Sequence, residues 1–160
     1  MSRIGHNVIA NMHPHTTETS NALLGSCLCG SVRYEVRSEV KAVAHCHCQM
    51  CQKAHGAAFG SYGSVPSDDF LVTAGIELMR GYNSSPGVQR TFCGACGSTL
   101  TWRASQGAWS SWTSFSLGTL DTLFIPEKHR HVHLASRPCW HLDSEGVSPG
   151  ASAARGESHQ

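Results

Sequence analysis

Eight cysteines in a chain of 160 residues limit what this sequence can fold into more than any other feature. Seven of them fall into three short clusters, which read GSCLCG, HCHCQMC and FCGACG, and the eighth stands alone. So many thiols have to be disulfides, metal ligands or reactive groups. In chain order they are Cys27 and Cys29, then Cys46, Cys48 and Cys51, then Cys93 and Cys96, and finally Cys139.

The expected compartment favours metal binding over disulfides. Residues 1–22 have neither the basic nor the apolar region of a secretory signal, and no run approaches the ~20 apolar residues that span a bilayer. We therefore expect a cytoplasmic protein, in which thiols stay reduced. A redox C-x-x-C normally lies in a βαβ unit, which this chain lacks, so a redox dithiol and a disulfide framework are the less favoured alternatives.

Charge and composition predict one folded domain without a polyanionic partner. The 12 basic and 11 acidic residues give a formal charge of +1, which offers no electrostatic case for nucleic acid or a membrane surface. We expect a domain over residues 23–143. The polar segment 1–22, with its scattered His6, His13 and His15, and the small polar segment 144–160 are expected to be disordered tails.

Within residues 23–143 the hydrophobic pattern has mostly a period of two, which predicts a mainly β fold with little helix. We expect several coiled antiparallel sheets and hairpins, pinned by zinc. Only residues 49–57 look helical. The expected strands lie over residues 32–36, 70–74 with 76–82 as a hairpin turning at Gly75, 88–92 with 98–102 as a hairpin around CGACG, 109–117, and 131–135.

The first and third cysteine clusters form a candidate structural zinc site. A tetrahedral zinc takes two thiolates from each of two short turns, and four protein ligands close the site. Cys93 and Cys96 are the stronger half, because Gly97 lets the backbone bend around the metal. Cys27 and Cys29 are the natural other half.

The middle cluster leaves three thiols at one place. Cys46, Cys48 and Cys51 can converge where a strand end enters a turn, and three protein ligands leave the fourth position open, as in catalytic zinc sites. Histidines nearby could instead complete a second structural site. The candidate fourth ligands of such a closed site are His45, His47 and His55. The spacing alone does not decide between the open site and the closed one.

The remaining conspicuous residues are expected to pack in the core. Cys139, between Pro138 and Trp140, is interpreted as a small buried hydrophobe without a metal role. The same expectation applies to the aromatic residues Trp102, Trp109, Trp112, Phe115 and Trp140.

Three blocks resemble the glutathione-dependent formaldehyde-activating enzyme and centromere protein V family: GSCLCGSVRYEV (25–36), HCHCQMCQKAHG (45–56) and RTFCGACGSTL (90–100). The resemblance covers about residues 24–143. It implies coiled β-sheets pinned by two zinc ions. By resemblance, Cys27, Cys29, Cys93 and Cys96 match the family's structural zinc ligands, and Cys46, Cys48 and Cys51 match the ligands of its active-site zinc.

The family's reaction implies a carbon–sulfur lyase that adds the glutathione thiol to formaldehyde, giving S-(hydroxymethyl)glutathione. Three thiolates make zinc a weak Lewis acid, so we expect the metal to hold the glutathione sulfur. Candidate carboxylate contacts are Arg80, Arg90 and Arg103, since arginine binds carboxylates bidentately, and His47 or His55 could relay a proton. The alternative is a non-catalytic, zinc-stabilised binding module, in which a fourth protein ligand would close the zinc site of the middle cluster.

Overall fold

The computed structural model describes residues 22–141, and these residues form two β-sheets with one short α-helix. The predicted tails lie outside the described residues, apart from Ala22. The strands are β1 (Leu23–Ser26), β2 (Arg33–Val36), β3 (Ala42–Cys46), β4 (Gly60–Pro66), β5 (Phe70–Ala74), β6 (Met79–Ser85), β7 (Val88–Cys93), β8 (Thr99–Ala104), β9 (Trp112–Ser116) and β10 (Arg130–Val132). The mainly β prediction is therefore confirmed.

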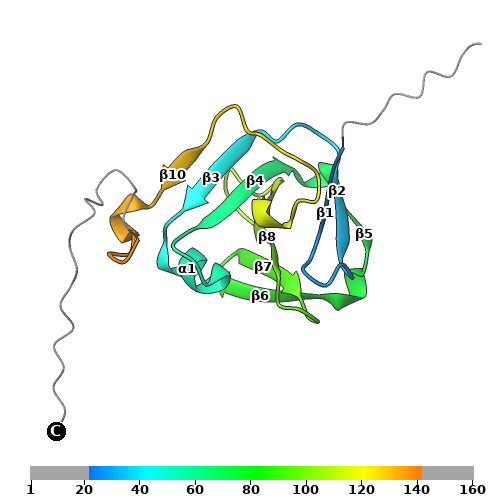
Figure 1. Cartoon of the computed structure of the whole chain (residues 1–160), viewed down its shortest axis with the longest axis horizontal. Helices are drawn as coiled ribbons and strands as arrows, with labels where there is room; N and C mark the ends of the chain where they lie inside the picture. Colours follow the sequence, from blue (N-terminus) through cyan, green and yellow to red (C-terminus); the bar gives the residue numbers. More distant parts are fainter. Residues whose placement is uncertain (1–21, 142–160) are drawn as a thin grey trace, which may run out of the picture.

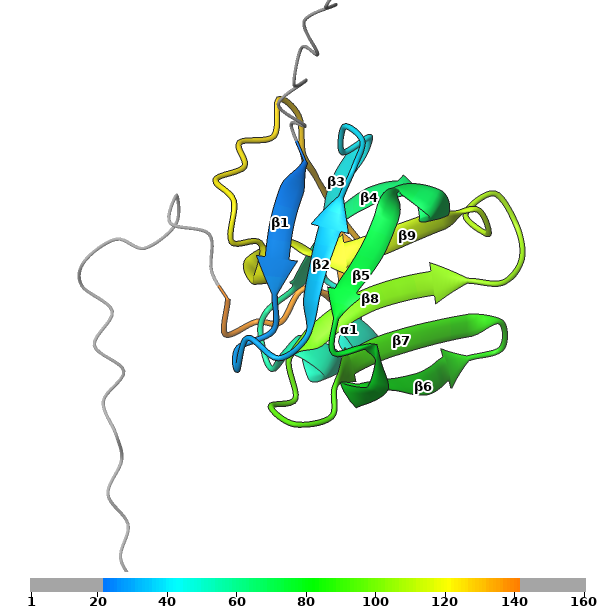
Figure 2. The same ribbon diagram turned by 90° about the vertical axis from the view of Figure 1, so that its right-hand side faces the viewer.

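The two sheets differ in size and face each other. The smaller sheet has the order β1-β2-β5, and the larger has the order β10-β3-β4-β9-β8-β7-β6. Figure 2 shows the small sheet in front of the large one, and Figure 1 shows it at one end of the molecule. All strand pairs are antiparallel except β10, which lies parallel to β3 at the sheet edge.

Aromatic and β-branched side chains fill the space between the sheets. Tyr34 and Val36 of β2 pack against Val65 of β4 and Phe115 of β9, and all four are almost fully buried. The Tyr34 ring lies 6.0 Å from the Phe115 ring, and its hydroxyl contacts Thr119 Oγ1 at 2.8 Å. Each such side chain stabilises the fold by roughly 1.5–3 kcal/mol, so this cluster joins the two sheets.

The predicted hairpin around CGACG is confirmed, but the one at Gly75 is wrong. Strand β5 pairs with β2 in the small sheet, whereas β6 pairs with β7 in the large one. Gly75 has a left-handed φ of 71°, and a single 3-10 turn over Ile76–Leu78 leads the chain from one sheet to the other. The alternating pattern correctly indicated two strands but carried no information about their partners.

The helix α1 (Gln49–His55) follows β3 directly and confirms the predicted helical segment. Its N-cap is Cys48, whose side chain accepts a hydrogen bond from the Cys51 backbone N–H. It ends at Gly56, which has a φ of 59°. No helix among residues 22–141 is long and apolar enough to cross a membrane.

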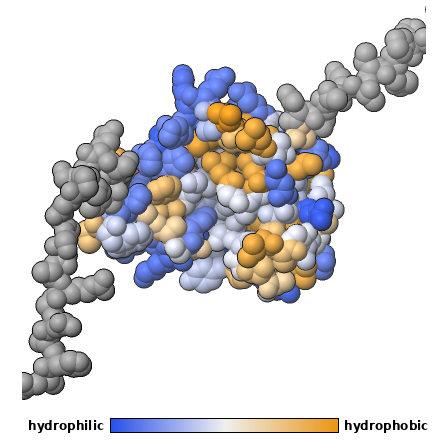
Figure 3. Space-filling view, viewed as in Figure 1, coloured by the Kyte–Doolittle hydropathy of each residue, from blue (hydrophilic) through white to orange (hydrophobic). Residues whose placement is uncertain are grey.

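The surface carries several isolated apolar side chains. Leu28, Leu123 and Ile125 are each more than three-quarters exposed. On the face turned to the viewer in Figure 3, hydrophobic patches are separated by hydrophilic areas.

Candidate metal centres and active site

The first and third cysteine clusters meet between the two sheets. Cys27 and Cys29 lie in the loop after β1, Cys93 ends β7, and Cys96 lies in the turn before β8. All four sulfur atoms lie within 4.8 Å of one another. The predicted grouping of these four thiols is therefore present in the structure. A metal ion bound by them would join a loop of the small sheet to a hairpin of the large one.

The surroundings of this cluster favour the thiolate form at Cys29 and Cys96, whereas the pKa of Cys93 is raised to about 11. The Val32 backbone N–H donates to Cys27 Sγ at 3.3 Å. The Ser98 hydroxyl and backbone lower the pKa of Cys96 to about 5. A zinc ligand has to be deprotonated, so hydrogen bonds to sulfur make the donor set suited to a divalent metal.

The middle cluster lies where β3 passes into α1. Cys46 is the last residue of β3, Cys48 is the N-cap of α1, and Cys51 lies in its first turn. Their sulfur atoms are also within 4.8 Å of one another, and no other cysteine, histidine or carboxylate of residues 22–141 belongs to this group. A strand end leading into a helix cap thus aims three thiols at one point.

A buried arginine contacts this cluster. Arg90 of β7 is 7% exposed, and its Nη2 donates to Cys51 Sγ at 3.5 Å. Its Nη1 donates to the Tyr62 hydroxyl at 2.9 Å, and that hydroxyl lies 2.7 Å from His55 Nε2. The ion pairs of the described residues, Arg37–Glu35 and Lys41–Glu39, do not include Arg90. The buried guanidinium therefore has the thiol cluster as its counter-charge.

Two thiols of the cluster, those of Cys46 and Cys51, have their pKa values shifted in opposite directions. The pKa of Cys51 is lowered to about 5, first by the hydrogen bond from the Cys46 thiol and then, against the effect of burial, by Arg90. The pKa of Cys46 is raised, because its thiol shares its proton with Cys51 and is partly buried. Burial also lowers the pKa of His55 and raises that of Tyr62.

The neighbouring histidines point elsewhere. His45 Nδ1 contacts Ser61 Oγ at 2.8 Å, and its Nε2 lies 3.0 Å from His129 Nδ1. His47 is buried, with Nε2 2.8 Å from His131 Nδ1. Because side chains alternate along β3, His45 faces away from Cys46. His55 Nε2 contacts the Tyr62 hydroxyl at 2.7 Å and does not belong to the thiol group, so the geometry favours the open-site alternative over a fourth histidine ligand.

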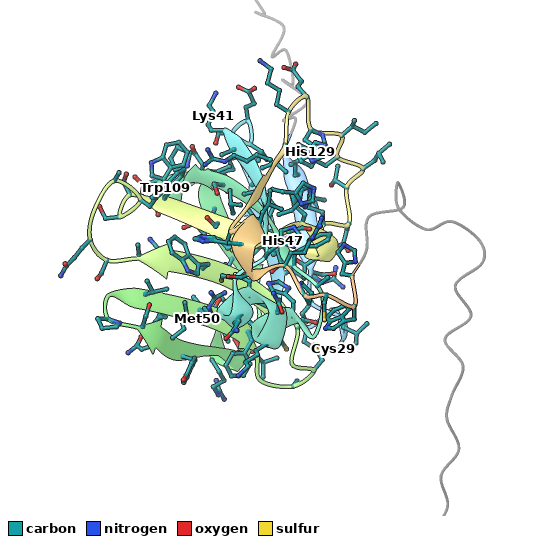
Figure 4. All side chains as sticks on the ribbon, turned by 90° about the vertical axis from the view of Figure 1, so that its left-hand side faces the viewer. Cys29, Lys41, His47, Met50, Trp109 and His129 are labelled. Carbon is teal, nitrogen blue, oxygen red and sulfur yellow. The ribbon has the colours of Figure 1, made fainter. Side chains whose placement is uncertain are left out.

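The thiol cluster opens into a pocket of about 360 Å³. Met50 of α1 and Trp109 line it together with Trp102 and Arg130. Figure 4 shows Met50 and Trp109 on one side of β10, with His47 and His129 on the other. A larger hollow of about 740 Å³ contains no cysteine or histidine, so the smaller pocket is the better candidate for chemistry.

Of the three predicted arginines, the pocket contains one. Arg90 lines it, Arg103 lines the larger hollow, and Arg80 donates to the carbonyls of Glu77 and Met79. Sequence reasoning missed Arg130, which reaches the pocket because β10 pairs with β3. It also missed Tyr62, which lies in β4, a strand that the hydrophobic pattern did not predict.

The core assignment at the C-terminal end was partly wrong. Cys139 is exposed and Trp140 is 68% exposed, because the chain continues past the edge strand β10 instead of returning to the core (Figure 1). Trp109 is 39% exposed at the pocket rim, whereas Phe115 is fully buried as expected.

Fold and site together define a small two-sheet β protein with two clusters of cysteine thiols, one of them open to a pocket. The family model described as glutathione-dependent formaldehyde-activating enzyme matches residues 22–136. The chain belongs to this family.

Individual relatives agree with this assignment. A protein of Halomonas elongata, provisionally named a glutathione-dependent formaldehyde-activating enzyme, is 31% identical over 126 residues, which cover 74% of this chain and 78% of that one. A Podospora anserina protein of the same provisional name is 38% identical over 77 residues, but the match spans only 36% of its length. A crystal structure of a Rhodobacter sphaeroides protein has a TM-score of 0.53 and 20% identity. It covers 63% of this chain and 90% of that one, and it supports the fold alone.

Proposed function

We propose that this protein is a zinc-dependent carbon–sulfur lyase that adds the thiol of glutathione to formaldehyde or a similar small electrophile. Family membership supports glutathione and formaldehyde as substrates. The observation that carries the proposal is the cluster of three thiols that opens into the pocket. A purely structural zinc site would be expected to have four protein ligands.

Two zinc ions per chain fit the donor sets. Cys27, Cys29, Cys93 and Cys96 would hold a structural ion, and the three cysteines of the middle cluster would hold the ion of the active site. When bound there, zinc would supply the positive charge that favours the thiolate form of a substrate thiol. We place the protein in the cytoplasm, where these cysteines stay reduced.

The middle cluster and Arg90 balance each other in charge. Three thiolates and a divalent ion sum to −1, and the buried guanidinium adds +1. Arg90 thereby holds Cys51 as a thiolate and orients Tyr62 by its second donor. It acts through these two residues, so it is a positioning residue and is unavailable to the carboxylates of glutathione.

Arg130 is the better carboxylate contact. It lines the pocket and has no ion-pair partner among the described residues. The walls made by Trp102 and Trp109 offer apolar area to the peptide of glutathione. Because formaldehyde offers little to bind, selectivity would come from these contacts with the thiol substrate.

The reaction forms one carbon–sulfur bond, and the proton that the glutathione thiol loses to solvent on binding is balanced by one that the aldehyde oxygen gains. His55 and Tyr62 are the proposed relay. Burial lowers the pKa of His55, so its ring is neutral near pH 7 and can accept a proton from solvent for transfer toward Tyr62. Burial raises the pKa of Tyr62, so its hydroxyl stays protonated and can donate one. His47, the other predicted candidate, lies near His131 on the opposite side of β3.

The test is the rate at which glutathione exchanges with its hydroxymethyl adduct at equilibrium, measured by NMR with formaldehyde present. We expect the zinc-loaded protein to accelerate this exchange, and Cys48→Ser to lose the acceleration while remaining folded. Exchange that stays at the uncatalysed rate in the native protein would contradict the proposal and favour the binding module.

A further inference from the structure

A third cluster of potential metal ligands lies on the opposite side of β3 from the cysteines. One ring nitrogen from each of His45, His129 and His131 lies within 4.8 Å of the other two. His45 belongs to β3, His129 directly precedes β10, and His131 lies within it. In the parallel ladder His131 is the partner of His45, and Val132 is the partner of Cys46. The histidines and the thiol of Cys46 therefore occupy opposite faces of the same strands.

We propose that His45, His129 and His131 form a third metal site, which binds a divalent transition metal of borderline softness such as nickel or zinc. Neutral imidazole is a preferred ligand of these ions. Figure 4 shows His129 at the upper end of this face, on the same side of β10 as His47.

The distances suit shared coordination. His45 Nε2 and His129 Nδ1 are 3.0 Å apart. Two nitrogens bound at ~2.0–2.1 Å to one tetrahedral zinc are about 3.3 Å apart, so little movement would be needed. His129 and His131 are exposed, which gives an ion in solution direct access to the cluster.

Two of the three rings also have the supporting partners that metal-bound histidines usually have. His45 Nδ1 contacts Ser61 Oγ at 2.8 Å, which leaves Nε2 as its ligand atom. His131 Nδ1 lies 2.8 Å from Nε2 of the buried His47, which leaves Nε2 of His131 for the metal. Partners of this kind fix the tautomer and orientation of a ligating ring.

An ion at this site would bind β10 to β3. Strand β10 has only three residues and lies at the sheet edge, yet its other face brings Arg130 and Val132 to the pocket. A metal that bridges His45 to His129 and His131 would hold this pocket wall in place. The site is thus distinct from the two cysteine clusters but mechanically linked to one of them.

The test uses nickel and three forms of the full chain, each first loaded with only two zinc ions per chain, enough for the two cysteine clusters, and held under anaerobic conditions. They are the native protein, His129→Ala and His133→Asn. His129 is exposed, so its loss should leave the fold intact. His133 is an exposed histidine four residues further on that lies outside the cluster, and asparagine tolerates its φ of 58°. Calorimetry gives the nickel bound, and a chromogenic chelator gives any zinc released.

We expect the native protein and His133→Asn to bind one more nickel ion than His129→Ala, or to bind it at least tenfold more tightly. No zinc should be released, and the charge-transfer absorption of a nickel–thiolate bond should be absent. Nickel should also slow amide exchange in β10 of the native protein but not of His129→Ala. Equal binding by His129→Ala, no nickel binding by the native protein, or binding that displaces zinc would each overturn the proposal.

Discussion

Arg90 is the residue whose contacts most directly link the core of the large sheet to the thiol cluster. Its two donors reach different acceptors, the Tyr62 hydroxyl at 2.9 Å and Cys51 Sγ at 3.5 Å. Lysine keeps the charge but cannot make both contacts from a planar fork. Because a hydrogen bond involving a charged group contributes roughly 1.5–3 kcal/mol, Arg90→Lys should lower kcat/KM for glutathione about tenfold or more.

The matched control for this prediction is Arg103→Lys. Arg103 lines the separate larger hollow, so its replacement should leave kcat/KM within about twofold of the native value. The measurement is the NMR exchange rate at several glutathione concentrations. Equal effects of the two variants would remove Arg90 from the proposed positioning role.

The buried His55 gives a second prediction at the residue scale, which concerns pH. Its pKa is lowered in the folded protein by burial, so below about pH 6.5 the unfolded chain binds more protons at this position. The contribution of His55 to the unfolding free energy is therefore complete above this pH and is lost as the pH falls.

Replacing His55 with glutamine removes this titration. Chemical denaturation at about pH 7.5 and about pH 5.5 should show a smaller loss of stability for His55→Gln than for the native protein. Zinc occupancy has to be matched between the samples, because acid also weakens thiolate sites. An identical pH dependence would mean that His55 is not held neutral by its surroundings.

At the scale of elements, Gly75 decides where the chain leaves the small sheet. Its φ is 71°, and an added Cβ would lie 2.2 Å from the Ser31 carbonyl oxygen. Left-handed backbone alone costs an alanine roughly 1–2 kcal/mol, and the backbone contact adds to this. Gly75→Ala should therefore lower the unfolding free energy by more than about 2 kcal/mol in chemical denaturation.

Gly107→Ala is the appropriate comparison. Gly107 has a similar φ of 79°, but no atom lies within 4 Å of the place where its Cβ would stand. We expect a loss of only about 1 kcal/mol there. If both variants lost the same stability, the close approach of Gly75 to Ser31 would carry no energetic weight.

How far the sequence predicted the structure depends on the distance along the chain over which each feature is determined. The grouping of cysteines within each cluster and the helix from Gln49 were predictable, because turns and caps involve residues a few positions apart. The hairpin at Gly75 was not, because alternation defines a strand without naming its partner. Arg130 and Tyr62 reach the pocket only through pairing of distant strands, and the exposure of Cys139 depends on the path of the chain after β10.

For the whole molecule, the two cysteine clusters should contribute differently to folding. Structural zinc can contribute roughly 10–16 kcal/mol of apparent binding free energy, which is comparable to the stability of a whole domain. Cys93→Ser breaks the four-thiol cluster between the two sheets and should give unfolded or insoluble protein. Cys48→Ser should stay folded with about one zinc ion per chain. Circular dichroism and metal analysis compare the two, and an equal loss of folding would indicate two structural sites.

The central claim is that a zinc ion held by Cys46, Cys48 and Cys51 would accept the sulfur of glutathione as its fourth ligand. Binding would then deprotonate the glutathione thiol, whose ordinary pKa is about 8.5, and release a proton near neutral pH. S-Methylglutathione has both carboxylates but no ionisable thiol. Titration calorimetry of the zinc-loaded protein in two buffers of different ionisation enthalpy should show proton release with glutathione, and weaker binding without proton release with S-methylglutathione. Equal binding of the two ligands with no proton release would contradict the claim.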